Sequence, residues 1–226
     1  MTNEASRPNV VLVVAHPDQE SATWAIGRAI EQGIRTDGTA TVTTHDLSRS
    51  GFDPVFGEQD LAHYRGRATV PADVLREQQL LDTAEVVVLL FPVYWWAMPA
   101  LAKGWVDRVF TRGWAYDDGP GGGPSAIRAL HFVGVAAVDE GSYDRRGYKE
   151  SMTTQMQHGI AGYSRIEDAS VQLLYGAETA DPHVHEQLVA QGLEIGAEMA
   201  RRAQLVFDRD NDVTVPTPPP PAGWRR

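Results

Sequence analysis

Three consecutive aromatic residues, Tyr94-Trp95-Trp96, follow the apolar run 86–91. Pro92 ends that run, so the three rings belong to a loop, where large aromatic side chains are unfavourable in water. Such rings can form the walls of a slot for a flat conjugated ligand, while backbone N–H and C=O groups contact its polar edge. The alternative is packing in the core or at a protein interface, where aromatic residues are also enriched.

A second group of polar residues, which includes His16, Ser21 and Thr23, follows the apolar run 10–15. A helix is expected to begin there. Its first turn has free N–H groups and a partial positive charge, which together suit a phosphate group. Ser21 has an alternative function, because a serine at this position also caps a helix without any ligand.

Tyr143 and Tyr148 follow a third apolar run, 130–138. Their phenolic O–H groups could complete the slot and give a proton or a hydrogen bond to a product oxygen that gains charge. Stacking against a ligand or a partner is the alternative role for both rings. A lone histidine further on, His158, is expected to be a surface residue rather than a catalyst.

The elements that position these residues can be predicted from hydrophobic patterns. Continuous β-branched runs are typical of strands buried on both faces of a parallel sheet, and here they alternate with helical patterns. Strands are expected at 10–15, 39–45, 85–91, 130–138 and 171–175, and helices at 24–38, 74–83, 99–110, 149–161 and 182–207. This alternation predicts an α/β three-layer sandwich with a five-stranded parallel sheet in the order 2-1-3-4-5. Ligands bind at the carboxyl ends of such strands, so the three groups of residues should meet there.

The chain of 226 residues is expected to form one domain, 8–208, followed by a proline-rich, extended and disordered tail, 209–226. Residues 46–71 are predicted to be irregular, and a loop of that length in a compact domain is usually functional. Residues 117–124 are rich in glycine and proline and are predicted to be a second loop.

Composition excludes several classes of function. Lys and Arg number 20 against 30 Asp and Glu, a net charge of −10, which argues against nucleic-acid binding. Cysteine is absent, so disulfides, thiolate nucleophiles, Cys-ligated zinc and iron–sulfur clusters are excluded, and no metal is expected. The apolar runs are too short to span a bilayer, and the start has no signal-like pattern. We therefore expect a cytoplasmic protein without an integral membrane segment.

Segment 91–110 resembles the flavodoxin-like NAD(P)H:quinone oxidoreductases, whose pattern there is Phe-Pro, two variable residues, Trp, then Pro-Ala, Leu-Lys-Gly-Trp and Arg-Val-Phe. Segment 113–116, Gly-Trp-Ala-Tyr, resembles the family too, especially its branch of ancillary proteins on potassium-efflux systems. Segment 15–21 is similar to the family's phosphate loop, and segment 143–148 to the loop after its fourth strand. The resemblance covers most of residues 9–205.

The resemblance implies a flavodoxin-like fold and a noncovalent flavin, FMN or alternatively FAD. The residues it implies are His16, Ser21, Ala22 and Thr23 at the phosphate, Pro92, Val93, Tyr94, Trp95 and Trp96 at the isoalloxazine ring, and Gly134, Val135, Ala136 and Ala137 where the backbone approaches closely. The last four residues stand where the family usually has Thr-Thr-Gly-Gly, so the hydroxyl groups are lost. Ala22 and Thr23 stand where it usually has Phe and Asn. FMN is favoured because no adenine-binding stretch stands out.

The implied activity is hydride transfer from NAD(P)H to the flavin, followed by transfer of two electrons to a quinone or similar flat aromatic acceptor. Tyr143 and Tyr148 are then the candidate catalytic residues. The choice between NADH and NADPH stays open, although Arg145 and Arg146 could contact a 2′-phosphate. The resemblance also implies a homodimer, with the helix from Pro99 and the loop 112–124 as contributors. The pair Trp105 and Trp114 is compatible with a dimer and equally with a monomer core.

Two alternatives belong to other classes. Segment 15–20 also resembles the Ala-His-Pro-Asp-Asp-Glu start of zinc-dependent sugar N-deacetylases, but Gln19 replaces the second Asp and no His-x-x-Asp-His partner is found. The other is a flavodoxin-like electron carrier or regulatory subunit of a transporter, without a small-molecule substrate of its own. The aromatic loop favours the enzyme over the carrier.

Overall fold

The computed structural model describes residues 7–116 and 127–211 of the chain. Within them, parallel strands form one sheet in the order β2-β1-β3-β4-β5, which confirms the predicted fold and strand order. The strands are β1 (Asn9–Val14), β2 (Thr41–Asp46), β3 (Val86–Pro92), β4 (Ala129–Val135) and β5 (Asp168–Leu174). The central strand β3 is buried along its whole length, as its unbroken apolar sequence predicts.

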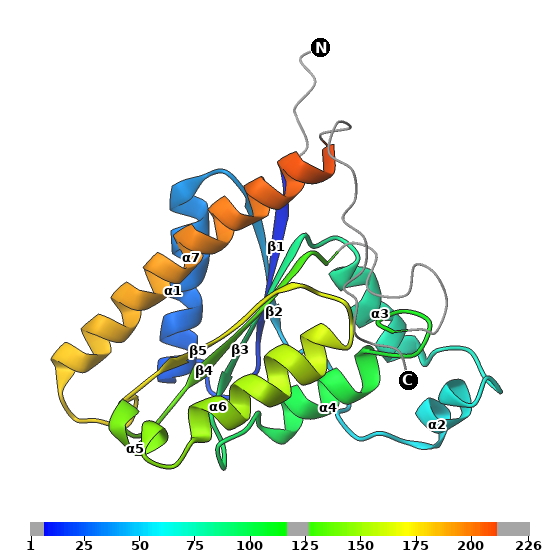
Figure 1. Ribbon diagram of the computed structural model, residues 1–226, viewed down its shortest axis with the longest axis horizontal. Helices are drawn as coiled ribbons and strands as arrows, with labels where there is room; N and C mark the ends of the chain where they lie inside the picture. Colours follow the sequence, from blue (N-terminus) through cyan, green and yellow to red (C-terminus); the bar gives the residue numbers. More distant parts are fainter. Residues whose placement is uncertain (1–6, 117–126, 212–226) are drawn as a thin grey trace.

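Helices cover both faces of the sheet and make three layers (Figure 1). The helices are α1 (Ala22–Asp37), α2 (Glu58–Tyr64), α3 (Ala72–Leu81), α4 (Ala100–Val109), α5 (Glu140–Asp144), α6 (Tyr148–Thr153), the π-helix η1 (Thr154–Gly162) and α7 (Pro182–Asn211). One face packs against α1 and α7, and the other against α3, α4, α6 and η1.

Strand β1 shows how the two cores arise. Val11 and Val13 belong to the cluster under α3 and α4, whereas Val10, Leu12 and Val14 belong to the cluster under α1 and α7. Successive side chains of a strand point to opposite faces, so an all-apolar strand can supply both cores at once. At the α1–α7 contact the backbones come so close that a Cβ on Gly196 would lie 2.1 Å from the carbonyl oxygen of Ile30.

The long segment 46–71, predicted to be irregular, contains the helix α2. It is held by Arg108 of α4, whose Nε lies 2.9 Å from Asp60 Oδ1 and whose Nη1 lies 2.6 Å from Asp73 Oδ2. The same guanidinium donates to the Asp53 carbonyl and lies 5.0 Å from the centroid of the Phe52 ring. The guanidinium is only 6 % exposed, and the two carboxylates of Asp60 and Asp73 neutralise its charge.

Two further boundaries differ from the sequence prediction. The helix expected at 149–161 is α6 continued by η1, whose turns are wider than those of an α-helix. Helix α7 continues to Asn211, where the side-chain amide donates to the Phe207 carbonyl (2.7 Å), so the predicted boundary between domain and tail at 208/209 falls inside this helix. The remainder of the predicted tail, 212–226, lies outside the described residues.

Candidate functional site

The loops that follow β1, β3 and β4 meet at the carboxyl edge of the sheet, as the strand order predicts (Figure 1). The strands hold them together by backbone hydrogen bonds at their ends. Ala15 N donates to Leu90 O (2.9 Å), and Val93 N donates to Val135 O (2.8 Å). The three groups of polar and aromatic residues are therefore neighbours in space, although they lie far apart in the sequence.

The loop after β3 is a two-residue hairpin turn with tryptophan at both central positions. Tyr94 N donates to Ala97 O (3.1 Å) and Ala97 N donates to Tyr94 O (3.0 Å). Trp95 and Trp96 have φ angles of 49° and 56°, in the left-handed region that favours glycine. A bulky residue in this region costs roughly 1 kcal/mol or more, and such strain is concentrated at functional sites.

Trp95 is also 87 % exposed, so core packing does not explain it. The turn instead presents its indole to solvent, where a ligand or another protein surface could contact it. Pro92, in contrast, is buried as the last residue of β3, and Val93 is half-buried directly after it. The predicted ring-binding segment 92–96 is therefore buried where it leaves the sheet at Pro92 and exposed at the turn around Trp95.

The aromatic residues of the loops after β3 and β4 form one continuous series. Trp96 stacks on Tyr148, with ring centroids 4.4 Å apart and planes inclined by 27°. Trp95 meets Trp96 edge-on at 5.9 Å, and Tyr143 meets Tyr148 edge-on at the same distance. The structure therefore brings both predicted tyrosines to the predicted aromatic loop.

The two tyrosines differ in accessibility. Tyr143 is 3 % exposed, and burial raises the pKa of its phenol, so the hydroxyl stays protonated at neutral pH. Tyr148 is half-buried at the start of α6, next to Gly147, which has a φ of 68°. Only Tyr148 of this pair is accessible to an incoming ligand in the observed arrangement.

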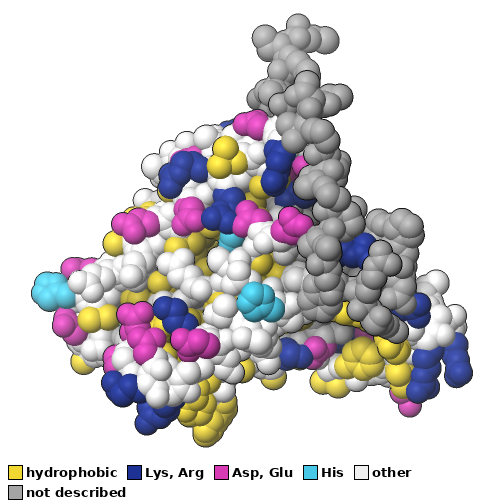
Figure 2. Space-filling model, in the orientation of Figure 1, with side chains coloured by type: hydrophobic (Ala, Val, Ile, Leu, Met, Phe, Trp, Pro, Cys, Tyr) yellow, Lys and Arg dark blue, Asp and Glu magenta, His cyan; other side chains and the backbone are white. Residues whose placement is uncertain are grey.

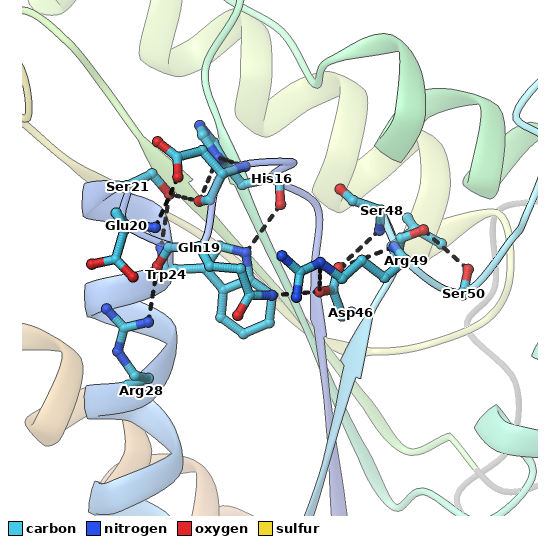
Figure 3. A network of polar contacts seen from close by, with 12 residues as sticks. His16, Gln19, Glu20, Ser21, Trp24, Arg28, Asp46, Ser48, Arg49 and Ser50 are labelled. Atoms are coloured by element: carbon cyan, nitrogen blue, oxygen red, sulfur yellow. Dashed lines mark hydrogen bonds and ion pairs between the residues drawn. The ribbon is translucent and has the colours of Figure 1, made fainter.

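The loop after β1 is closed by hydrogen bonds of its own (Figure 3). Ser21 Oγ accepts from Trp24 N (3.3 Å) and donates to Asp18 O (2.7 Å), which is the capping role left open above. His16 Nδ1 lies 3.1 Å from Asp18 N, and Trp24 Nε1 donates to the His16 carbonyl (3.0 Å). Ser21 Oγ accepts from the N–H of Trp24 and Ser21 O accepts from that of Ala25, so the N–H groups of Ala22 and Thr23 are those that remain for an anion in the first turn of α1.

Thr23 can contribute to a phosphate site only through its backbone. Its side chain is 2 % exposed and points into the core, so it offers a phosphate no hydroxyl, whereas Ala22 beside it is half-buried. The reason is helical geometry: Thr23 lies in the first turn of α1 on the side that covers the sheet, together with Trp24 and Ile26.

A polar network joins this loop to the end of β2, and sequence reasoning missed it. Gln19 Nε2 donates to Asp46 Oδ2 (2.6 Å), Arg49 Nε lies 3.8 Å from the same oxygen, and Arg28 Nη1 donates to Gln19 O (3.0 Å). Figure 3 shows these side chains around the start of α1. The amide of Gln19, the position that breaks the zinc pattern, is thus committed to a carboxylate.

The small residues at the end of β4 have a packing role. A Cβ on Gly134 would lie 2.7 Å from Leu173 Cδ2 and 3.0 Å from Val93 Cγ2, so Gly134 is required by its neighbours in the sheet. The expectation that the backbone of these four residues closely approaches a ligand stays a prediction. Val135 and Ala136 are buried as well, and Ala137 is the half-buried member of the group.

Comparison with known proteins gives the family. Residues 8–196 match the family described as having a flavodoxin-like fold. The chain belongs to this family. A curated relative, an uncharacterized NAD(P)H oxidoreductase of Escherichia coli (strain K12), is 30 % identical over 167 residues, which cover 73 % of this chain and 82 % of the relative. The NAD(P)H dehydrogenase [quinone] 1 of Cavia porcellus is 25 % identical over 213 residues, covering 82 % and 75 %.

Solved structures agree on the flavodoxin-like fold. An NAD(P)H:quinone oxidoreductase from Methanothermobacter marburgensis superposes with a TM-score of 0.79 at 23 % identity, covering 86 % of this chain and 98 % of that one. An FMN-dependent NADH-azoreductase from Bacillus anthracis, solved in complex with FMN, gives 0.67 at 13 % identity, covering 86 % and 100 %. The expected family is confirmed, and so is the expected class of enzyme, an oxidoreductase.

The structure also locates Trp105 and Trp114, the two tryptophans considered for a dimer contact or a monomer core. Trp105 is fully buried and donates from Nε1 to Glu77 Oε2 (2.8 Å), so it belongs to the core of its own chain. Trp114 is half-buried and donates to Asp82 Oδ1 (3.0 Å), while most of the expected dimer loop, 117–124, lies outside the described residues.

Residues 7–116 and 127–211 contain no group of three potential metal ligands. No helix in those ranges is long and apolar enough to cross a membrane.

Proposed function

We propose that the chain is a flavin-dependent NAD(P)H oxidoreductase that passes two electrons to a quinone or a similar flat aromatic acceptor. The observation that carries the proposal is the hairpin turn after β3. Two tryptophans occupy a strained turn, one of them is almost fully exposed, and the other stacks on a tyrosine from the neighbouring loop. Strain of this kind is retained where function requires it, and a flat ring ligand gives it a use.

The residues present fit a flavin. Its phosphate would take the free N–H groups of the first turn of α1, with His16, Ser21, Ala22 and Thr23 contributing backbone and the shape of the loop rather than hydroxyl groups. The ring would lie along segment 92–96 and the end of β4, where Ala137 is half-buried. FMN is the proposed form and FAD the alternative, since no adenine-binding stretch stands out in the sequence.

When bound, a flavin accepts a hydride from NAD(P)H and returns two electrons to an acceptor. The chain's own residues orient and shield the reactants. Trp96 and Tyr148 offer stacking surfaces, and the exposed Trp95 extends the apolar wall. The Tyr148 hydroxyl would give a hydrogen bond to an acceptor oxygen, while the buried Tyr143 contacts the Tyr148 ring edge-on and supports it.

A homodimer is part of the proposal. Val55, Phe56 and Tyr64 are exposed around α2, and Figure 2 shows hydrophobic side chains gathered on this part of the surface. Large exposed apolar side chains that lie close together are typical of protein interfaces. Size-exclusion chromatography with light scattering tests the state, and Phe56→Asp is expected to shift a dimer toward monomer.

Steady-state turnover tests the activity. NAD(P)H oxidation should continue for many cycles with a soluble quinone and FMN present, and it should stay at background without the quinone. A protein that is reduced once but does not turn over a quinone would be an electron carrier or a regulatory subunit instead.

A further inference from the structure

Tyr175 has a buried hydroxyl group without a partner. Its phenolic oxygen is inaccessible to solvent and finds no hydrogen-bond partner among residues 7–116 and 127–211. Buried polar groups in proteins are almost always hydrogen-bonded, so an exception calls for a partner of another kind. Ser48 and His131 also have a buried side-chain atom without a partner among the described residues, but of these residues Tyr175 is the one whose ring contacts Tyr143 of the site.

The position of Tyr175 relates it directly to the site. It follows the last residue of β5, at the carboxyl edge of the sheet. Its ring meets the ring of Tyr143 edge-on at 5.2 Å, so the aromatic series continues from Trp96 through Tyr148 and Tyr143 to Tyr175.

The backbone on both sides of Tyr175 is bonded to the end of β4. Ala136 N donates to Leu174 O (2.7 Å), and Ala177 N donates to Ala136 O (3.0 Å). Tyr175 is therefore fixed beside the segment Gly134-Val135-Ala136-Ala137. That segment has no side-chain hydroxyl or amide, so it cannot supply a hydrogen-bond donor from its side chains.

We infer that the Tyr175 hydroxyl is a ligand-binding group, which donates a hydrogen bond to a carbonyl oxygen of the flat ring bound at this edge of the sheet. Because the hydroxyl is inaccessible to solvent in the observed arrangement, this contact requires neighbouring side chains, such as the Tyr143 ring packed against it, to move when the ring binds. The inference rests on the proposed function and adds a residue to it. The carbonyl belongs either to the flavin or to the quinone. Both carry carbonyl groups on a planar ring, and the experiment below separates them.

The surroundings of Tyr175 keep its hydroxyl protonated, so that it can donate a hydrogen bond. Burial, together with the negative charges of Glu140 and Asp144, raises the pKa of Tyr175 to about 12. The phenol therefore holds its proton throughout the physiological range and forms a hydrogen bond rather than transferring the proton. Glu140, Asp144 and Glu150 are exposed, and none of them bonds to the hydroxyl.

The test compares Tyr175→Phe with wild type, and with Tyr163→Phe as a matched control at an exposed tyrosine. The melting temperature of the apoprotein is measured first. Removing an unpartnered hydroxyl should leave it unchanged or raise it. A clear fall for Tyr175→Phe alone would show that the hydroxyl is already bonded within the chain, for instance to a rotated carboxylate, and would overturn the inference.

The Kd for FMN and the visible bands of bound FMN are then measured, followed by kcat/KM with benzoquinone and with ferricyanide, which offers no carbonyl. A hydrogen bond to the flavin predicts a Kd about five- to tenfold higher and shifted bands. A hydrogen bond to the quinone predicts unchanged FMN binding and a similar loss of kcat/KM with benzoquinone only. Either result supports the inference and identifies the carbonyl.

Unchanged FMN binding, spectrum and kcat/KM with both acceptors would overturn the inference while the proposed function stands. A wild-type protein that binds neither FMN nor FAD contradicts the proposed function itself, and the role of Tyr175 with it. The two failures are therefore distinguishable.

Discussion

The indole of Trp96 stacks on the phenol ring of Tyr148, with centroids 4.4 Å apart, and so joins the loop after β3 to the loop after β4. Trp96 holds this contact from a backbone with φ of 56°, and Tyr148 holds it from the start of α6, after a glycine in the left-handed region. A left-handed backbone conformation thus positions each ring, at Trp96 itself and at Gly147 before Tyr148. A flat ligand that enters here has to stack beside this pair or separate it.

Trp95→Ala should weaken FMN binding by about tenfold or more, because it removes the aromatic surface on which the flavin ring would stack. The indole is 87 % exposed, so its removal should leave the core intact. FMN fluorescence titration measures this Kd. Trp95→Gly should lose FMN in the same way but raise the stability of the apoprotein by on the order of 1 kcal/mol, since glycine relieves the positive φ. Unchanged flavin content in both variants would contradict the placement of the ring.

Tyr148→Phe should slow the oxidative half-reaction with a quinone more than the reductive half-reaction with NAD(P)H, as expected for a group that donates to an acceptor oxygen. Tyr143→Phe should act in the same direction but more weakly, because Tyr143 is buried behind Tyr148. Anaerobic stopped-flow absorbance separates the two half-reactions. Equal slowing of both would show that the tyrosines only stack.

Arg108→Met should destabilise the fold by about 3–5 kcal/mol, because it leaves two carboxylates around a buried position without their cation. Urea unfolding measures the change. Arg35→Met is the control, since it breaks an exposed pair with Glu31 on α1 and should cost under about 1 kcal/mol. A similar small loss in both variants would show that segment 46–71 is not held by Arg108.

His131 predicts a pH dependence of stability. Burial in β4, and then the positive charge of Arg202, lower its pKa to about 4. An unfolded histidine binds a proton near pH 6.5 while the folded one does not, so stability should fall as the pH drops from about 6.5 toward 4, by up to about 3 kcal/mol. His131→Leu should flatten the unfolding free energy between pH 5 and 6.5. A slope equal to that of wild type would contradict the assignment.

Sequence patterns were sufficient to predict the sheet and the loops that meet at the carboxyl ends of its strands. The continuous apolar runs in β1 and β3 are short and rich in β-branched residues, which is typical of strands buried on both faces, and the strand order then brings the loops after β1, β3 and β4 together. Local signals also placed the starts of α3 and α4 after Pro71 and Pro99.

What could not be predicted depends on contacts between distant residues or on backbone angles. Helix α2 is fixed by the pairing of Asp60 with Arg108, 48 positions away. The left-handed conformations of Trp95 and Trp96 contradict residue preference, so no propensity points to them. Ser21 illustrates a third case, because one sequence position fits both a phosphate ligand and a helix cap, and only the hydrogen bond from Trp24 N shows the cap.

The most direct test of the proposed function is the visible spectrum of the purified protein under anaerobic conditions, after incubation with FMN and removal of unbound ligand. We predict bound flavin bands that bleach on addition of NADH or NADPH and return on addition of a quinone. A protein that retains neither FMN nor FAD, or whose flavin is not reduced by either nucleotide, would contradict it.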